Sequence, residues 1–479
     1  MGVGLTERGF ARGDVFAIYC PNLPEYAVAF LAVAALGGIV TTINPLYTAD
    51  ELAHQLADTD ARYLLTIPPL LDTARAAVAR CGHIREIFVL GDTSGAPGAT
   101  PFANLLARDG SLPAVPIDPQ ADLVVLPYSS GTSGRPKGVM LTHYNLVAQL
   151  CQFDAVQYSD ETLIAVLPFF HIYGMMLILL LSLWHKGTLV MLARFDLEQF
   201  LRCLQDYDVQ RAPLAPPIIL ALAKHPLVDS YAHAHLRIIG SGAAPLGAEL
   251  ERACAERMGC LVLQGYGMTE AAGATHVPPD PARRSDGSGI RTGSCGPTLP
   301  NMETMVVDLI SGKALGPREQ GEILLRGPNV MQGYLQQPEA TAQALDADGW
   351  LHTGDVGYVD EDGYLYVVDR VKELIKYNAY QVAPAELEAL LLTHPAIADA
   401  AVIPSPDEEA GEAPKAVVVL RAPLTPEEIM SFVAARVAPY KKVRRVEIVE
   451  QIPRSASGKI LRRVLIERER AALAALDPA

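Results

Sequence analysis

The sequence alternates short apolar, β-branched runs with segments of helical spacing, and this alternation most strongly limits the folds open to the chain. Helical patterns such as residues 49–56 and 246–257 lie between some of the runs. Strands that alternate with helices predict layered α/β sheets. The runs in question are residues 15–19, 39–43, 63–66, 87–90, 123–126, 188–192, 236–239 and 261–263.

From about Gly293 the pattern changes, and candidate strands follow one another with little helix between them. The strands are predicted at residues 305–307, 321–325, 356–359 and 364–368. An Asp-Glu-Asp-Gly turn at 360–363 joins the last two and predicts antiparallel pairing.

A second, smaller α/β unit is predicted after residue 369. It contains a helix at 384–392, strands at 398–403 and 415–420, a loop at 404–414 between them, and a helix from Pro426. A typical domain has about 100–200 residues, so several domains are expected in 479 residues. We therefore predict a large domain over residues 1–369 and a small one over 370–479.

Composition excludes several classes of protein. The net charge is 39 − 54 = −15 and only 6% of residues are aromatic, which argues against a nucleic-acid partner. The basic run within residues 441–470 is interpreted as a solvated helix face. The apolar stretches 26–43 and 175–184 are too short or too interrupted for a transmembrane helix, and residues 1–14 lack the apolar core of a signal peptide. Seven cysteines without a CxxC pair predict unpaired thiols in the cytoplasm.

The segment SSGTSGRPKG at 129–138 gives the strongest chemical signal. It follows a predicted buried strand directly, and it combines glycines, hydroxyl groups and Lys137. Glycines let backbone N–H groups approach an anion, while hydroxyls and an ammonium group add donors and charge. The segment therefore predicts a phosphate-binding loop, although it does not match the Walker pattern GxxxxGK[ST].

This loop closely resembles that of the adenylate-forming enzymes, and five further blocks follow in the family's order. The blocks are SGAAP at 241–245, QGYGMTE at 264–270, GWLHTGD at 349–355, DRVKELIKY at 369–377 and PRSASGK at 453–459. PFFHIYG at 168–174 and QVAPAELE at 381–388 resemble the 4-coumarate–CoA and fatty acyl–CoA ligase branch. The resemblance implies an α/β fold with two α/β sheets and a distorted β-barrel in the large domain, and a mobile α+β lid as the small domain. Fewer residues than usual precede residues 13–15, which leaves the first strand of the large domain in doubt.

The resemblance also implies roles for individual residues. The ATP- and AMP-binding residues would be Ser129, Ser130, Gly131, Thr132, Ser133, Lys137, Ala243, Ala244, Pro245, Gln264, Gly265, Tyr266, Thr269, Asp355 and Arg370. Glu270 and Thr132 would bind Mg²⁺. Tyr173, Met176 and Ala243 would contact the acyl group, and Arg194, Asn378 and Ala379 would contact CoA. The catalytic residues would be His171, Lys376, Gln381 and Lys459, with Lys372 at the hinge.

The implied reaction joins a carboxylic acid to CoA in two halves, through acyl-AMP with release of pyrophosphate. The acid is expected to be a hydroxycinnamate-like aromatic acid or a medium- to long-chain fatty acid, and the enzyme a cytoplasmic monomer or homodimer. Alternatives are an adenylation enzyme that loads a carrier protein, a luciferase-like oxygenase and a non-enzymatic nucleotide-binding relative. Asn378-Ala379 replaces the family's usual Lys-Gly, so we expect slower thioester formation rather than none.

Overall fold

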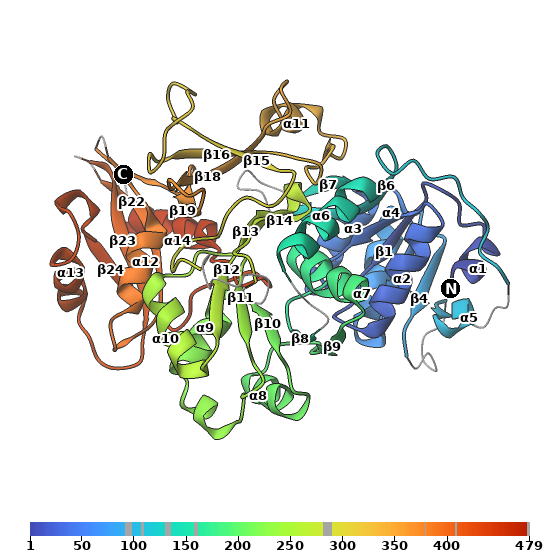
Figure 1. The fold of residues 1–479 in the computed structure, drawn as a ribbon, viewed down its shortest axis with the longest axis horizontal. Coiled ribbons are helices and arrows are strands. Elements are labelled where there is room, and N and C mark those ends of the chain that lie inside the picture. The colour runs from blue at the N-terminus through green and yellow to red at the C-terminus, as the bar shows by residue number, and fades with distance from the viewer. Residues whose placement is uncertain are drawn as a thin grey trace.

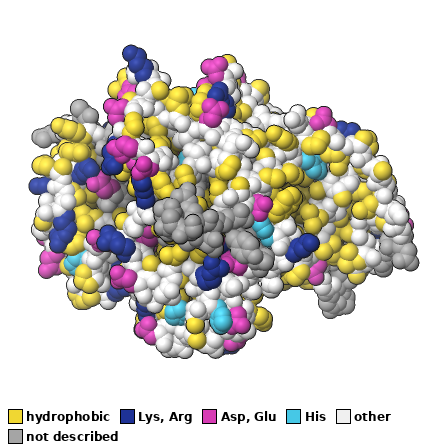
Figure 2. Space-filling model, viewed as in Figure 1, with side chains coloured by type: hydrophobic (Ala, Val, Ile, Leu, Met, Phe, Trp, Pro, Cys, Tyr) yellow, Lys and Arg dark blue, Asp and Glu magenta, His cyan; other side chains and the backbone are white. Residues whose placement is uncertain are grey.

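The computed structural model describes residues 1–91, 98–106, 110–129, 136–157, 161–280, 290–378, 380–407 and 410–476. Figure 1 shows four parts: an N-terminal sheet with its helices, a second parallel sheet, an antiparallel sheet above them, and a small C-terminal unit at the side. Figure 2 shows basic side chains scattered among acidic ones over the face in view, without a single basic patch.

The first sheet has the strand order β17-β7-β6-β2-β1-β3-β4-β5. Its strand β1 (Val15–Ile18) is fully buried and pairs in parallel with β2 (Ile39–Thr42) and β3 (Ala61–Thr66). The strand predicted at residues 15–19 therefore forms, and it lies inside the sheet. The other strands are β4 (Glu86–Val89), β5 (Thr100–Pro101), β6 (Leu123–Ser129), β7 (Lys137–Thr142) and β17 (Gly333–Tyr334). The helices of this region are α1 (Gly2–Thr6), α2 (Pro24–Ala35), α3 (Ala49–Asp58), α4 (Leu71–Cys81) and α5 (Ala103–Leu106).

The second sheet is parallel throughout and has the order β12-β11-β10-β8-β9. Its strands are β8 (Thr162–Ala165), β9 (Thr188–Met191), β10 (Arg211–Leu214), β11 (Ile238–Ser241) and β12 (Leu261–Gln264). Because the strands are parallel, their carboxyl ends meet at one edge, which is where ligands bind in such sheets.

The helices in this part of the chain are α6 (His143–Val156), the π-helix η2 (Tyr173–Leu180) that continues into α7 (Leu181–His185), α8 (Leu197–Asp206), α9 (Pro216–Lys224) and α10 (Ala248–Met258). Helix α6 contacts β7 of the first sheet, whereas η2 contacts β8 and α10 contacts β12 of the second. Across the segments that the structure describes, no helix is long and apolar enough to cross a bilayer.

The third part is antiparallel, as predicted. Its four-stranded sheet comprises β15 (Glu303–Val307), β16 (Gly321–Arg326), β18 (Leu351–Val359) and β19 (Leu365–Arg370). The predicted turn at 360–363 joins β18 to β19, and Gly363 adopts the left-handed φ of 84° that the turn requires. A ribbon of β13 (Tyr266–Met268) and β14 (Gly273–His276), together with α11 (Pro338–Ala344), completes this part.

The small unit has its own sheet and its own core. The strands are β20 (Ile375–Tyr377), β21 (Tyr380–Val382), β22 (Ile397–Asp407), β23 (Gly411–Leu420) and β24 (Arg445–Ile448), and the helices are α12 (Pro384–Leu392), α13 (Pro426–Ala434) and α14 (Arg462–Leu476). Its core includes Ile375, Leu387, Val402 and Val418, each fully buried.

The loop predicted at residues 404–414 is wrong. Strands β22 and β23 stay paired through most of it, with Pro404 opposite Pro414 and Asp407 opposite Gly411. The prolines suggested a break in the strands. However, β22 lies at the edge of its sheet, where alternate N–H groups face away from the neighbouring strand, so Pro404 and Pro406 remove no hydrogen bond from the ladder.

Candidate active site

A cavity of about 570 Å³ lies where the carboxyl ends of β11 and β12 meet the antiparallel sheet and the small unit. Residues from β6, β18 and β19 line it, and so does the loop that precedes α14. The blocks singled out in the sequence span residues 129–459, and the fold brings residues from all of them except QVAPAELE at 381–388 to this one cavity.

Asp355 is the acidic centre of the cavity. Tyr266 donates its hydroxyl to Asp355 Oδ2 at 2.6 Å, and Arg370 Nε lies 3.4 Å from Oδ1. Burial raises the pKa of Asp355, while the charge of Arg370 opposes that shift. The three side chains therefore hold one carboxylate in a fixed position, where it can accept hydrogen bonds from a sugar.

Lys459 enters the cavity from the small unit. Its loop is held by Arg454, which pairs with Asp399 at 2.8 Å and donates to the Gly458 carbonyl at 2.8 Å. Burial, followed by repulsion from Arg370, lowers the pKa of Lys459, and the charges of Asp355 and Glu270 oppose the shift. Lys459 therefore lines the same cavity as the two carboxylates.

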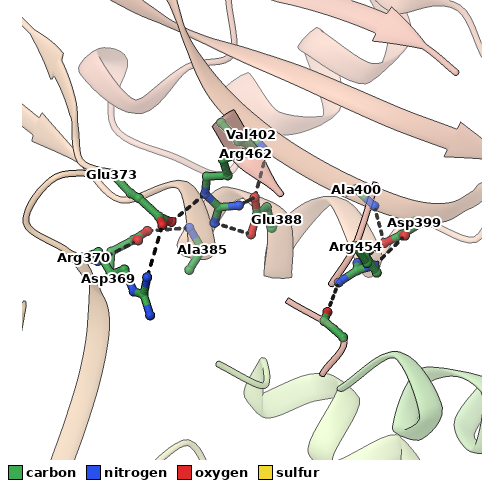
Figure 3. A network of polar contacts seen from close by, with 11 residues as sticks. Asp369, Arg370, Glu373, Ala385, Glu388, Asp399, Ala400, Val402, Arg454 and Arg462 are labelled. Carbon is green, nitrogen blue, oxygen red and sulfur yellow. Dashed lines mark hydrogen bonds and ion pairs between the residues drawn. The ribbon is translucent and has the colours of Figure 1, made fainter. Parts of the chain in front are cut away.

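A buried network of ion pairs fixes the segment that joins the two units (Figure 3). Arg462 lies 2.9 Å from Glu373 and 2.8 Å from Glu388, and Glu373 lies 3.8 Å from Arg370. Asp369 accepts hydrogen bonds from the backbone N–H groups of Arg370 and Ala385. The network links the start of α14 to the arginine beside Asp355.

Glu270 is the second acidic group of the cavity and is only 7% exposed. Tyr334 donates its hydroxyl to Glu270 Oε1 at 2.9 Å. The ammonium group of Lys137 lies 4.6 Å from the centre of the Tyr334 ring, a cation–π contact. Tyr334 therefore contacts both Glu270 and Lys137, which belongs to β7.

The backbone around Ala243 is strained. Ala243 has a φ of 72°, which a residue with a Cβ rarely adopts outside functional sites. At Gly242 an added Cβ would lie only 2.6 Å from the Tyr173 ring, so the chain passes close to that ring. Gln264 supports the loop: its Oε1 accepts the N–H of Leu246 at 3.1 Å, and its Nε2 donates to Glu251 at 2.6 Å.

His171 lies at the cavity wall as an uncharged ring. Burial, with a contribution from Lys459, lowers its pKa to about 3. Its Nδ1 accepts the backbone N–H of Tyr173 at 3.3 Å, so the neutral ring has its proton on Nε2. His171 can therefore donate one hydrogen bond to an oxygen in the cavity.

Most of the predicted site residues line this one cavity. They are Ser129, Lys137, His171, Tyr173, Ala243, Gln264, Gly265, Tyr266, Thr269, Glu270, Asp355, Arg370, Lys372 and Lys459. Ser130, Gly131, Thr132, Ser133 and Ala379 lie outside the described residues.

Other predicted residues are not at the cavity wall. Met176 is fully buried in the core, because η2 turns Tyr173, Leu177 and Leu181 toward the cavity and Met176 away from it. Ala244 and Pro245 also lie off the wall, and Arg194 is exposed. Lys376, Asn378 and Gln381 lie together on the exposed β20–β21 hairpin, where Lys376 is opposite Gln381.

Sequence reasoning missed three residues of the site. Tyr334 contacts Glu270, and Arg211 and Gln157 line the end of the cavity farthest from Lys459. None of them belongs to a local motif. An arginine within an otherwise apolar strand, QRAPLAPP at 210–217, was the one available signal for Arg211.

Comparisons with known proteins agree with this geometry. The family described as AMP-binding enzyme matches residues 1–335, and the AMP-binding enzyme C-terminal domain matches residues 386–459. A 4-coumarate–CoA ligase from Pinus taeda is 43% identical over 98% of this chain and 87% of its own length. The anthranilate CoA ligase AuaEII with anthranoyl-AMP superimposes with a TM-score of 0.90 at 26% identity, covering 99% of this chain and 90% of its own.

A further solved structure, MatB from Rhodopseudomonas palustris, is known in two forms. The ATP-bound form gives a TM-score of 0.88 at 29% identity, covering 98% of this chain and 92% of its own. The apo form, also 29% identical over 98% of this chain and 91% of its own, gives 0.76. This chain is thus more similar in arrangement to the ATP-bound form. By sequence and by fold, the chain belongs to the AMP-binding enzyme family.

Proposed function

We propose that this protein is an acid–thiol ligase that converts a carboxylic acid, ATP and CoA into an acyl–CoA thioester, AMP and pyrophosphate. The observation that best supports the proposal is that Lys459 of the small unit lines the same cavity as Asp355, Glu270 and the neutral ring of His171. A site that joins two anions, here a carboxylate and ATP, needs positive charge as well as carboxylates held in fixed positions. This cavity contains the ammonium group of Lys459 and the carboxylates of Asp355 and Glu270.

In the first half-reaction, an oxygen of the substrate carboxylate attacks the α-phosphorus of ATP. A new O–P bond forms, the bond to the bridging oxygen of pyrophosphate breaks, and acyl-AMP remains. Lys459 and Lys137 supply positive charge that offsets the charge on the phosphoryl oxygens. His171 orients the substrate carboxylate through its Nε2–H, and Asp355 accepts the ribose hydroxyls.

The residues present also suit Mg²⁺, which prefers oxygen ligands and keeps several of its waters. Glu270, held by the Tyr334 hydroxyl, would bind the ion. When bound, the ion supplies charge neutralisation for the phosphates. The two lysines of the cavity, Lys137 and Lys459, are cations, so they do not compete with the Glu270 carboxylate as ligands of Mg²⁺.

In the second half-reaction, the thiol of CoA attacks the acyl carbonyl carbon, a C–S bond forms, and AMP leaves with the electrons of the C–O bond. Lys376 and Gln381 are proposed to serve this step. Both are exposed on the β20–β21 hairpin, outside the cavity. We therefore propose that residues 370–479 rotate about Lys372 between the two halves, with the domain boundary after residue 369.

The acid is proposed to be a hydroxycinnamate-like aromatic acid or a fatty acid, as the name of the Pinus taeda relative supports. A carrier-protein adenylation enzyme and a luciferase-like oxygenase remain the alternatives, and neither is favoured by the relatives. All seven cysteines are unpaired, which supports the prediction of a reducing, cytoplasmic compartment.

Two assays test the proposal. Acid-dependent release of pyrophosphate from ATP, with and without CoA, measures the first half, and thioester formation from supplied acyl-AMP and CoA measures the second. We expect pyrophosphate release without CoA, and thioester only with it. Light emission without thioester would favour the oxygenase, and acyl transfer to a carrier protein but not to CoA would favour the adenylation enzyme.

A further inference from the structure

We propose that Glu322 is a positioning residue, which fixes the bulge of β18 that presents Asp355 to the ribose of the nucleotide. The inference rests on the proposed ligase function, in which Asp355 accepts the ribose hydroxyls. It depends on three observations: a break in the pairing of β16 with β18, the side chains that hold the chain at this break, and the link from the break to the hinge.

The pairing of β16 with β18 is interrupted beside the cavity. The pairs on either side of the break are Glu322 with Val356 and Leu324 with His352. One residue of β16 therefore lies opposite three residues of β18, 353–355. Such a bulge disrupts the ladder of backbone hydrogen bonds and changes the direction of a side chain, and bulges are common next to active sites. Asp355 belongs to this bulge.

Side chains hold the bulge where the backbone ladder does not. Glu322 Oε1 accepts the backbone N–H of Gly354 at 3.1 Å. Thr353 donates its hydroxyl to the Ile323 carbonyl at 2.7 Å, and the same hydroxyl oxygen accepts the N–H of Asp355 at 3.0 Å. A backbone N–H group that loses its partner away from water is costly, so these bonds stabilise the bulge. The bulge thus depends on Glu322 from one strand and on Thr353 from the other.

Gly354 lies at the centre of the bulge and connects it to the small unit. It adopts a left-handed φ of 68°, which favours glycine. Its N–H is bonded to Glu322, and its carbonyl accepts the N–H of Val371 at 2.8 Å, next to the proposed hinge at Lys372. Glu322 therefore anchors to the antiparallel sheet a residue that also contacts the hinge.

Asp355 is held at two ends. Tyr266 and Arg370 contact its carboxylate at 2.6 Å and 3.4 Å. Glu322 acts on its backbone instead, through the N–H of Gly354. Contacts to the carboxylate alone would leave the backbone free to shift, and a misplacement of about 1 Å is enough to cost a positioned group much of its effect.

The side chain of Glu322 is itself held in one place. Its second oxygen, Oε2, lies 3.3 Å from His352 Nδ1, and the side chain is only 20% exposed. A residue that positions a functional group must have its own conformation fixed by neighbouring contacts. Glu322 meets this requirement, and it lines the same cavity as Asp355.

The first test uses nucleotides that lack one ribose hydroxyl. ATP is compared with 2′-deoxy-ATP and 3′-deoxy-ATP in acid-dependent pyrophosphate release, and the readout is the ratio of kcat/KM for ATP to that for each analogue. We expect the wild type to prefer ATP to at least one analogue by about 10-fold or more, the scale of a hydrogen bond to a charged group. Glu322→Leu has a similar size but no acceptor, so its ratio should fall several-fold toward one, with a higher KM for ATP.

Matched variants separate position from general damage. Glu322→Gln keeps an acceptor oxygen for the Gly354 N–H and should keep the ratio. Thr353→Val removes the other side chain that holds the bulge and should lower the ratio, whereas Thr353→Ser keeps the hydroxyl and should not. The control is Glu303→Leu, which loses an exposed ion pair with Arg326 on β15 and β16 of the same sheet. It should leave the ratio unchanged.

The outcomes separate the inference from the ligase proposal. If Glu322→Leu is slower with all three nucleotides but keeps the wild-type ratio, its loss is structural and the positioning role is overturned. An equal decrease in Glu322→Gln would overturn it too, because the bond to Gly354 would not be the cause. If Glu322→Leu does not fold, the two Thr353 variants carry the same test, and equal ratios in both would overturn the role of the bulge.

Two results in the wild type address the premises. A wild type that does not distinguish the three nucleotides would overturn the ribose contact of Asp355, and the inference with it, and would leave the ligase intact. Absence of acid-dependent pyrophosphate release from ATP with hydroxycinnamates and with fatty acids would overturn the ligase proposal itself.

Discussion

Two surfaces of the small unit differ sharply in their surroundings. The loop of Lys459 lies in the cavity, where Arg454 and Ser455 hold it. The β20–β21 hairpin, with Lys376 and Gln381, is exposed to solvent and does not line the cavity. Both carry residues that the family resemblance assigns to catalysis. A single rigid arrangement cannot bring both to one acyl group, so under the proposed mechanism the arrangement seen would serve the first half-reaction.

Several contacts that hold this arrangement can be tested. Lys224 of α9 donates to the Leu392 carbonyl at the end of α12 at 2.6 Å, and a Cβ built on Gly247 would lie 2.9 Å from the Cβ of Ala389. Gly458 passes close to Ala215, and Val356 packs with Leu374 and Ala383. A polar bridge from the small unit to Asp355 passes through Arg370.

The largest expected effect comes from the two lysines. Lys459→Met should slow pyrophosphate release by ~10²-fold or more, the scale for losing a preorganised charge at a reaction centre, and should still convert supplied acyl-AMP. Lys376→Met should show the reverse pattern. Each variant is the control for the other, measured by pyrophosphate release and by thioester formation. Equal losses of rate in both half-reactions for both variants would contradict the assignment of Lys459 to the first half-reaction and Lys376 to the second.

Glu270→Gln should reduce pyrophosphate release by ~10²-fold, because the amide keeps the shape but loses the charge that binds Mg²⁺. Thioester formation from supplied acyl-AMP should change little. Tyr334→Phe is the matched control, since it removes only the hydrogen bond to Glu270 and should cost a few-fold at most. Similar losses in both variants would show that Glu270 acts through its position rather than its charge.

Lys224→Met should have a smaller effect, and the effect should differ between the two half-reactions. Loss of its bond to Leu392 weakens only the arrangement seen here, so pyrophosphate release should slow several-fold and thioester formation should not slow. Lys313→Met, at an exposed lysine that belongs to neither α9 nor α12, is the control. A matching decrease in both steps would mean that Lys224 supports stability rather than domain position.

The smallest expected effect is a dependence of stability on pH at the hinge. Burial raises the pKa of Asp369 to about 6, so the folded protein binds this proton more tightly than the unfolded chain. The group therefore lowers the free energy of unfolding as pH rises from about 4 to 6, by at most about 3 kcal/mol. Asp369→Asn should abolish this slope in denaturant titrations. An identical slope in wild type and variant would contradict the assignment.

The sequence predicted regular elements well where local signals were strong. The helix predicted at 384–392 forms with those bounds, since Pro384 occupies its first position and Leu387 and Leu391 are spaced to share a buried face. Strand β10 was not predicted, because Pro213 argues against a central strand. Its pairing with β11 and β8 overrides that local signal.

The site residues also fall into two groups, those that local sequence signals predicted and those that they did not. Residues in contiguous blocks, such as Glu270 and Asp355, were found from sequence because each block keeps its chemistry together. Tyr334 was not found from the sequence. Strand β17 is brought to the site by its pairing with β7, and β7 begins almost two hundred residues earlier in the chain. Met176 was assigned to the acyl wall from the family resemblance. The π-helix places Tyr173, Leu177 and Leu181 on the cavity face, and no local pattern foretold that rare geometry.

A reversible crosslink between the two units tests the central claim most directly. In Gly247→Cys/Ala389→Cys the two Cβ atoms are close enough for a disulfide after a small shift, and each single variant, oxidised in parallel, controls for the native cysteines. The oxidised double variant should still release pyrophosphate in one turnover and accumulate acyl-AMP, yet form no thioester until it is reduced. Thioester formation at the wild-type rate in the crosslinked protein would contradict the rotation of the small unit between the two half-reactions.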